Sequence, residues 1–297
     1  MLPTQRVRRL DFNMLKRIDI PGATLSVTDI GQGPPILFVH GFPLDHTMWR
    51  NQLTELSRNH RCIAPELRGF GQSSVTAGKV SMEQFADDLA ALLDALGITE
   101  PVVLCGLSMG GYIAWQFVRR HVARLRALIL CDTRAVPDSP EAVANRLKLA
   151  DDVMRSGPEL VANAMLSRLF APNTTAHRPE WVHELRQVML ATNPQGIAAA
   201  SRGMAERGDA RPLLPTIQCP TLVIVGEHDV ISPPAEMRDI ATAIPRSVFQ
   251  IIADAGHMAP LEQPLATNAA IHQFLASTSL VPTEPFMPLA SAKKSEP

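Results

Sequence analysis

Short apolar runs alternate with helix-like periodicity along most of the chain. Eight of these runs have the length and composition of β-strands. They are Ile18–Ile20, Leu25–Thr28, Ile36–Val39, Cys62–Ala64, Val102–Cys105, Leu128–Cys131, Thr221–Val225 and Val248–Ile252. The first two flank Pro21 and Gly22, a pair that predicts the turn of a hairpin.

Amphipathic helices separate the later runs. Apolar residues between Ser81 and Leu96 recur every three or four positions, Ser81 and Gln84 predict a capping box, and Gly97 predicts the end of the helix. Two further helices are predicted at Ile113–Val122 and at Ala235–Ile244, the latter opened by Ser232 and the prolines that follow it. This strand–helix alternation predicts an α/β fold with a mostly parallel sheet covered by helices on both faces.

One region breaks the alternation and predicts an inserted helical lid. Residues 134–209 contain no convincing strand, and helices are predicted to begin near Ser139, Pro158 and Pro179. The proline-rich end of the chain is aperiodic and predicts disorder. The expected organisation is a flexible arm at 1–15, an α/β body at 16–133 and 210–277, the lid at 134–209 and a disordered tail at 278–297.

Composition narrows the classes of partner. The net charge of −1 over 297 residues, with no basic stripe, argues against a nucleic acid or an anionic membrane as partner. No apolar run approaches the roughly 18–20 residues of a membrane span, and the first residues do not resemble a secretory signal. The four cysteines lie in or beside strand-like runs without metal-ligand spacing. We therefore expect a cytoplasmic protein without disulfides, bound metal or cofactor.

A serine flanked by glycines provides the first candidate for chemistry. Ser108 follows the run Val102–Cys105, and Gly106 and Gly110 stand two positions to each side of it. A G-x-S-x-G segment between a strand and a helix is typical of a nucleophile held on a sharp turn. Such a short pattern also occurs by chance, and the predicted strand before it and helix after it are what support this interpretation.

A serine nucleophile needs a base and a carboxylate that orients the base. Among the nine histidines, His257 has the expected position, because it lies on a loop after the last strand-like run. Asp229 directly follows the preceding run and is the expected acid. Asp132, at the end of the run before that, is a rival for the same role, although capping of the local turn is its more ordinary use.

Negative charge that develops on a substrate carbonyl needs preorganised N–H donors. The expected donors are the backbone N–H of Met109, directly after the serine, and that of Phe42, on the loop after Ile36–Val39. Pro43 has no N–H to offer. His40 is expected to brace this loop through hydrogen bonds and to take no part in the chemistry.

Five separated motifs together resemble the α/β-hydrolase fold superfamily, in its serine carboxylesterase and 3-oxoadipate enol-lactonase branch. They are HGFPLDHTMW, ELRGFGQSS, CGLSMGGY, VGEHDVISP and GHMAPLEQP, in this order along the chain. The resemblance implies an eight-stranded, mostly parallel sheet flanked by helices, with the lid after the sixth strand. It also implies Ser108 as nucleophile, Asp229 as acid and His257 as base, and Phe42 and Met109 as the oxyanion hole. Glu66 departs from the aspartate usual at its position, which puts a loop hydrogen bond in doubt.

These residues predict acyl transfer on a small-molecule ester of small to medium acyl size. Haloalkane dehalogenases and epoxide hydrolases of this superfamily carry aspartate at the serine position, so Ser108 disfavours both activities. An apolar pocket is expected from five side chains, those of Trp49, Phe42, Met109, Met165 and Phe170.

Four alternative functions stay open. A 3-oxoadipate enol-lactonase would perform the same chemistry on a cyclic ester with carboxylates, and Arg134, Arg168 or Arg202 could bind those carboxylates. The same triad could also cleave a C–C bond or use peroxide in place of water. The alternative from a different functional class is a ligand receptor that has the hydrolase fold but no catalytic activity.

Overall fold

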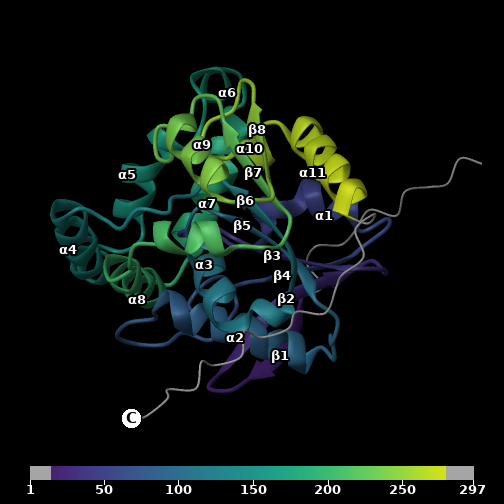
Figure 1. Cartoon of the computed structure of the whole chain (residues 1–297). Helices are drawn as coiled ribbons and strands as arrows, with labels where there is room; N and C mark the ends of the chain where they lie inside the picture. Colours follow the sequence, from purple (N-terminus) through teal and green to yellow (C-terminus); the bar gives the residue numbers. More distant parts are fainter. Residues whose placement is uncertain (1–14, 279–297) are drawn as a thin grey trace, which may run out of the picture.

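The computed structural model describes residues 15–278 and is built around one sheet of eight strands (Figure 1). The strands are β1 (Lys16–Ile20), β2 (Ala23–Ile30), β3 (Pro35–Val39), β4 (Arg61–Pro65), β5 (Val102–Leu107), β6 (Leu125–Cys131), β7 (Thr221–Gly226) and β8 (Ser247–Ile252). Their order across the sheet is β1-β2-β4-β3-β5-β6-β7-β8. The predicted arm and tail lie almost wholly in residues 1–14 and 279–297, outside the described residues.

Strand direction gathers six loops at one edge of the sheet. β1 and β2 pair antiparallel, as do β2 and β4, whereas every pair from β4 to β8 is parallel. The carboxyl ends of β4, β3, β5, β6, β7 and β8 therefore lie along the same edge. Ligands of open parallel sheets bind outside these carboxyl ends.

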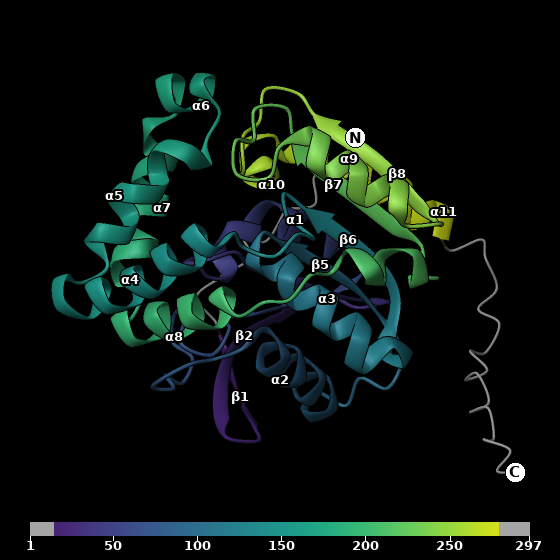
Figure 2. The same cartoon turned by 60° about the vertical axis from the view of Figure 1, so that its left-hand side comes forward.

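Helices cover both faces of the sheet, as the strand–helix alternation predicts (Figures 1 and 2). One face carries α2 (Met82–Ala95), α3 (Met109–His121) and α9 (Pro234–Ala243), and the other carries α1 (Arg50–Leu56) and α11 (Pro264–Thr278). Along β3, Leu37 and Val39 belong to the first core cluster, whereas Ile36 and Phe38 belong to the second. Both faces of the central strands are buried, so these strands read as continuous apolar runs.

Five helices connect β6 to β7 and gather to one side of the sheet, where we call them the cap (Figure 2). They are α4 (Pro140–Ser156), α5 (Glu159–Leu169), α6 (Pro172–His177), α7 (Pro179–Ala191) and α8 (Pro194–Ala205). The predicted starts near Ser139, Pro158 and Pro179 correspond to α4, α5 and α7. α6 and α8 were not predicted as separate helices, although Asn193 caps α8 and precedes Pro194.

Short helical segments complete the structure. They are the 3-10 turns η1 (His46–Trp49), η2 (Val122–Arg124) and η3 (Arg211–Thr216), and the helix α10 (Ala259–Glu262). None of the helices in residues 15–278 has the length and apolar character that would let it cross a bilayer.

Two predicted caps differ from the observed ones. Ser81 Oγ accepts the N–H of Gln84 at 3.2 Å, but the Gln84 amide donates to Asp88 at 2.9 Å, so among the described residues only half of the capping box forms. The buried Asp88 carboxylate, paired with Arg68, is a stronger acceptor nearby. The N-cap of α9 is Pro233, and Ser232 turns its hydroxyl toward the predicted active site instead.

The cap lies directly against the body through glycine. A Cβ at Gly196, in α8, would be 1.8 Å from the carbonyl oxygen of Gly69. Three residues later, the carbonyl of Ala199 accepts the N–H of Val80 at 3.1 Å. The first turns of α8 therefore pack backbone against backbone on the loops that follow β4.

We predict that Gly196→Ala destabilises the protein by about 1–3 kcal/mol, the usual cost of overpacking a close contact. The matched control is Gly208→Ala, because a Cβ at Gly208 meets no atom within 4 Å. Urea unfolding of both variants measures the difference in the free energy of unfolding. Equal stability of the two variants would show that the contact at Gly196 relaxes freely.

Candidate active site

Ser108, the predicted nucleophile, lies on the turn between β5 and α3. Its backbone has φ 54° and ψ −110°, a positive-φ conformation that is strained for a residue with a side chain. A Cβ at Gly106 would lie 2.5 Å from the carbonyl oxygen of Gly110, and a Cβ at Gly110 would lie 2.3 Å from that of Val39. Glycine at both positions is what lets strand, turn and helix approach so closely.

Backbone hydrogen bonds on both sides hold this turn. The N–H of Ser108 donates to the carbonyl of Cys131 at the end of β6, at 3.0 Å. The Ser108 carbonyl accepts from the hydroxyl of Thr133 at 2.8 Å and from the N–H of Tyr112 at 3.2 Å. The side chain of Ser108 itself is half-buried. The hydroxyl is therefore carried on a backbone fixed by two neighbouring strands and one helix.

The loop after β3 lies against the serine turn. A Cβ at Gly41 would be 3.5 Å from Ser108 Cβ. The N–H of Gly41 donates to Met48 Sδ at 3.4 Å, and that of Leu44 donates to the Gly41 carbonyl at 2.9 Å. Within residues 15–278, no group accepts the N–H of Phe42. This N–H is therefore available to a ligand, as the sequence predicts for an oxyanion donor.

Met109, the other predicted donor, is the first residue of α3. The first N–H groups of a helix have no partner within the helix, and the helix dipole places partial positive charge there. The side chain of Met109 is fully buried. The two N–H groups stay predictions for the oxyanion hole.

His40 braces the loop that carries Phe42, which confirms the structural role expected for it. Its Nδ1 lies 2.9 Å from the carbonyl of Gly41, and its Nε2 accepts the N–H of Leu67 at 3.0 Å. The ring is fully buried, and burial lowers the pKa of His40. A neutral ring with its proton on Nδ1 satisfies both contacts.

His257 and Asp229 meet as the sequence predicts. His257 Nδ1 lies 2.8 Å from Asp229 Oδ2, and both side chains are almost completely buried. The loop that carries His257 packs tightly, because a Cβ at Gly256 would lie 2.6 Å from the backbone nitrogen of Ala171. Ser232 Oγ lies 3.4 Å from the same Nδ1 and is a second polar neighbour of the ring.

Asp229 is held as a carboxylate. Its Oδ1 accepts the N–H groups of Ile231 at 2.7 Å and Ser232 at 3.1 Å, while Oδ2 faces His257. Burial alone raises the pKa of Asp229, but the nearby His257 and these N–H donors outweigh burial and keep this pKa below its usual value. The group behind His257 therefore carries a negative charge.

Asp132, the rival acid, lies beside this pair without replacing Asp229. Its Oδ1 accepts the N–H of Gly226 at 2.8 Å, and it has the positive φ of 47°. Carboxylate and ring atoms of Asp132, Asp229 and His257 all lie within 4.8 Å of one another. The structure thus places Asp229 in contact with His257 and Asp132 one position further along the sheet edge.

Glu262 joins the His257 loop to the cap and was not singled out from the sequence. Its Oε1 accepts the N–H of Gly256 at 2.7 Å, and its Oε2 accepts that of Ala171 at 2.8 Å. Burial raises the pKa of this carboxyl, against donors that lower it, Thr174 first among them. A lone glutamate inside the turn APLEQP, directly after the candidate base, was the signal that could have identified it.

The predicted pocket residues differ in how deeply they are buried. Trp49 is fully buried and packs on Phe38, with ring centroids 5.3 Å apart. Met165 is half-buried between the two halves of the core, and Phe170 is buried at the edge of the cap. Phe42 is nearly buried, at 7% exposure. Contact of any of these side chains with a substrate stays a prediction.

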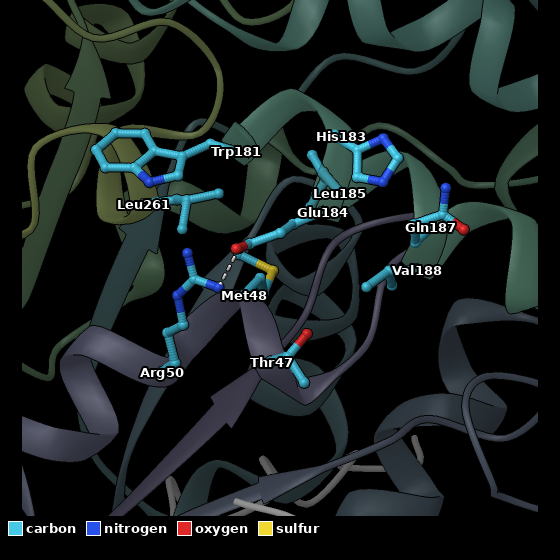
Figure 3. Close-up of a pocket in the computed structure, with 10 residues that line it drawn as sticks. All are labelled: Thr47, Met48, Arg50, Trp181, His183, Glu184, Leu185, Gln187, Val188 and Leu261. Carbon is cyan, nitrogen blue, oxygen red and sulfur yellow. Dashed lines mark hydrogen bonds and ion pairs between the residues drawn. The ribbon is translucent and has the colours of Figure 1, made fainter. Parts of the chain in front are cut away.

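Two hollows open near the site. The first, which we call the α7 hollow, has a volume of about 330 Å³ and is lined by residues that include Met48, Arg50 and Leu261 (Figure 3). The second, of about 350 Å³, is lined by residues that include Phe170 and Asp229. Ser108 lines neither of them.

The arginines that could bind a substrate carboxylate have different surroundings. Arg134 pairs with Glu236 at 2.9 Å, and Arg202 pairs with Asp151 at 2.9 Å. Arg168 lines the second hollow and is exposed. Of the three predicted arginines, Arg168 is the one placed beside a residue of the candidate triad.

Glu66 makes hydrogen bonds within its loops, although its side chain is one methylene longer than the aspartate usual at this position. Its Oε2 accepts the N–H of Gln72 at 2.6 Å, and its Oε1 lies 3.0 Å from His46 Nδ1. Asp45, His46 and Glu66 could together offer three ligand atoms to a cation, as could the exposed group Glu227, His228 and Asp254. Hydrogen bonds of the first group to its own loops account for its position.

Solved structures and a curated protein sequence resemble this chain over most of its length. An esterase from Thermogutta terrifontis, solved with malate bound, is 50% identical with a TM-score of 0.87, over 89% of this chain and 98% of that one. The enol-lactonase from Burkholderia xenovorans LB400 is 30% identical with a TM-score of 0.82, over 88% and 100% of the two chains. The 3-oxoadipate enol-lactonase 2 of Acinetobacter baylyi is 28% identical over 88% of this chain and 96% of its own.

The family model described as alpha/beta hydrolase fold matches residues 34–264. This match covers most of the chain and contains Ser108, Asp229 and His257. The chain belongs to the α/β-hydrolase fold family.

Proposed function

We propose that this protein is a serine hydrolase that cleaves carboxylic esters of small to medium acyl groups through an acyl-enzyme on Ser108. The observation that carries the proposal is the buried 2.8 Å contact between His257 and Asp229, at the same sheet edge as the strained serine turn. A histidine that donates from Nδ1 to a carboxylate presents an unprotonated Nε2. That is the state that a general base requires.

In the first half-reaction, Ser108 Oγ attacks the carbonyl carbon of the ester while His257 Nε2 takes the hydroxyl proton. The carbonyl oxygen becomes an oxyanion, which the N–H groups of Phe42 and Met109 stabilise. Loss of one such donor typically costs about 3–4 kcal/mol of transition-state stabilisation. The C–O bond to the alcohol then breaks, and the alcohol leaves with the proton held by His257.

In the second half-reaction, water replaces the alcohol. His257 takes a proton from the water as its oxygen attacks the acyl carbon, and the same N–H groups stabilise the second oxyanion. Collapse of this intermediate releases the carboxylic acid and returns the proton to Ser108. Asp229 keeps its negative charge throughout and stabilises the imidazolium that forms in both halves.

Two observations support an open-chain ester as the substrate. The esterase from Thermogutta terrifontis has 50% identity to this chain, against 30% for the enol-lactonase from Burkholderia xenovorans. Arg134 and Arg202 are paired with Glu236 and Asp151, so a substrate carboxylate would have to displace one of these acids.

A 3-oxoadipate enol-lactonase is the second candidate, and Arg168 is the observation that favours it. This arginine lines the hollow that Asp229 also lines, so a cation is available beside the triad. The chemistry at Ser108 would be the same, with the lactone ring oxygen as leaving group. Preference between ester and lactone therefore depends on the cap and not on the triad.

The proposed mechanism needs one negative charge behind His257, although two carboxyls lie there. Asp132 is fully buried, and its Oδ2 has no hydrogen-bonding partner within the described residues. Burial, reinforced by the charge of Asp229, raises the pKa of Asp132 well above its usual value. Asp132 therefore gives up its proton less readily than Asp229 does.

The raised pKa of Asp132 leads to a prediction for stability against pH. The unfolded chain ionises this carboxyl above about pH 4 and the folded protein does not, so rising pH favours the unfolded state. Asp132→Asn removes this penalty and suits the positive φ of 47°. The difference in the free energy of unfolding between the variant and wild type should therefore increase, in favour of the variant, by up to about 1.4 kcal/mol for each pH unit above about pH 4.

Urea unfolding of both proteins at several pH values between 4 and 8 measures this gain. The expected result is a difference that grows with pH and then levels off where the folded protein also loses the proton. A difference that does not change with pH would mean that Asp132 is ionised in the folded protein.

The central prediction concerns Ser108→Ala. Turnover of p-nitrophenyl esters from acetate to decanoate should fall by at least about a thousandfold, because the oxyanion donors alone leave little catalysis. The chain length with the highest kcat/KM then gives the size of the acyl pocket. Circular dichroism of the variant controls for folding.

Measurements with 3-oxoadipate enol-lactone separate the two candidates. Strong turnover of the lactone with feeble ester cleavage, lost in Ser108→Ala, would replace the esterase by the lactonase. Equal residual activity in wild type and variant would contradict Ser108 as nucleophile. Failure of the wild type to react with a fluorophosphonate probe would favour a ligand receptor without catalysis.

A further inference from the structure

The α7 hollow lies between the cap and the body, apart from Ser108. Helix α7 forms one side, and η1 with the start of α1 forms the other (Figure 3). Its volume of about 330 Å³ is within the range of pockets that bind small molecules. Because Ser108 does not line it, this space is not required by the proposed reaction.

The lining combines a buried apolar floor with a charged mouth. Met48, Leu185 and Leu261 are 2%, 5% and 4% exposed and form the floor. Arg50 and Glu184 point toward each other and are joined by an ion pair of 2.5 Å (Figure 3). Their side chains are 36% and 53% exposed, so this pair lies at the surface. An apolar surface with a few placed charges is typical of sites for amphipathic ligands.

The ion pair at the mouth can be exchanged at little cost. Exposed pairs of this kind contribute about 0–1 kcal/mol. Another carboxylate can therefore take the place of Glu184 on the guanidinium of Arg50, which binds carboxylates through two parallel N–H donors. The apolar floor lies beside this cation, so a ligand that reaches both must join a carboxylate to an apolar chain or ring.

We propose that the α7 hollow is a second ligand site, which binds a small amphipathic carboxylate such as a medium-chain carboxylic acid. The apolar part contacts Met48, Leu185 and Leu261, and the carboxylate pairs with Arg50. Binding there is independent of the chemistry at Ser108 and goes beyond the proposed function.

The floor of the hollow is connected to the loops of the candidate active site. Met48 Sδ accepts the N–H of Gly41, the neighbour of Phe42, at 3.4 Å. The N–H of Leu261 donates to the carbonyl of Met258, the neighbour of His257, at 2.8 Å. A ligand that contacts this floor therefore touches the supports of both loops. If the proposed function holds, the bound acid is of the same class as the product of the reaction.

Calorimetric titration of Ser108→Ala protein with octanoate, and with octanol as its uncharged analogue, tests the proposal. Arg50→Gln should weaken octanoate binding at least about fivefold, because it removes the charge-assisted pair. Glu184→Gln should strengthen it by about threefold, because it removes the competing carboxylate. Neither change should alter the binding of octanol by more than about twofold.

The matched control is Arg58→Gln, a 59% exposed arginine that does not line the hollow and should leave octanoate binding unchanged. The methyl resonance of Met48, identified with Met48→Leu, should shift on addition of octanoate and report where it binds. Thermal unfolding of each variant shows that it is folded.

Three outcomes would overturn the proposal. They are the absence of saturable octanoate binding, equal effects of Arg50→Gln and Arg58→Gln, and octanoate binding that leaves the Met48 resonance in place, which would locate it at another site. The test uses protein that lacks the Ser108 hydroxyl, so its result does not depend on whether the wild type is an esterase. If the esterase proposal failed, the proposal of this second ligand site would not be affected.

Discussion

The positive-φ turn at Ser108 depends on contact between backbone segments from three strands. Gly110 lies against the carbonyl of Val39 at the end of β3, and the N–H of Ser108 reaches Cys131 at the end of β6. The register of the sheet sets these contacts, since Gly106 is paired with Val39 on one side and Leu107 with Cys131 on the other. A shift of one residue in either pairing would turn the core side chains of β5 to the opposite face. The core and the candidate site are therefore specified by the same register.

Two carboxyls at the ends of neighbouring strands show how surroundings divide roles between like groups. The Asp229 carboxyl receives two backbone N–H bonds and faces His257, whereas the Asp132 carboxyl accepts the N–H of Gly226. Both are buried, so the nearby His257, together with the N–H donors, decides that Asp229 is the one with the lowered pKa. A charge on both would leave an unpaired carboxylate in the core, which the structure avoids by pushing the two pKa values apart.

The sequence predicts features that depend on local pattern, and it fails where a side chain outside that pattern competes. Continuous apolar runs identify the central strands, because these are buried on both faces, whereas the edge strands β1 and β8 alternate between more and less exposed positions. Spacing and chain order were enough to pair His257 with Asp229, since parallel strands end at one edge. By contrast, Gln84 binds Asp88 in place of its predicted cap, and Ser232 lies beside His257 in place of capping α9. Asp88 lies one turn further along the same helix and is held in place by Arg68, whereas His257 lies on a loop that follows β8.

Two hydrogen-bonded anchors hold the part of the cap that contains α6 and α7 against the loops of the candidate site. Glu262 binds the cap at Ala171 and the base loop at Gly256, and the hydroxyl of Thr192 donates to the carbonyl of Pro43 at 3.1 Å. These two anchors lie before α6 and after α7, and each fixes a loop of the candidate site. Between them, α7 stands over an apolar hollow behind one exposed ion pair. The ends of this segment hold the loops of the candidate triad in place, so variation in the helix between them can change the hollow without disturbing these loops.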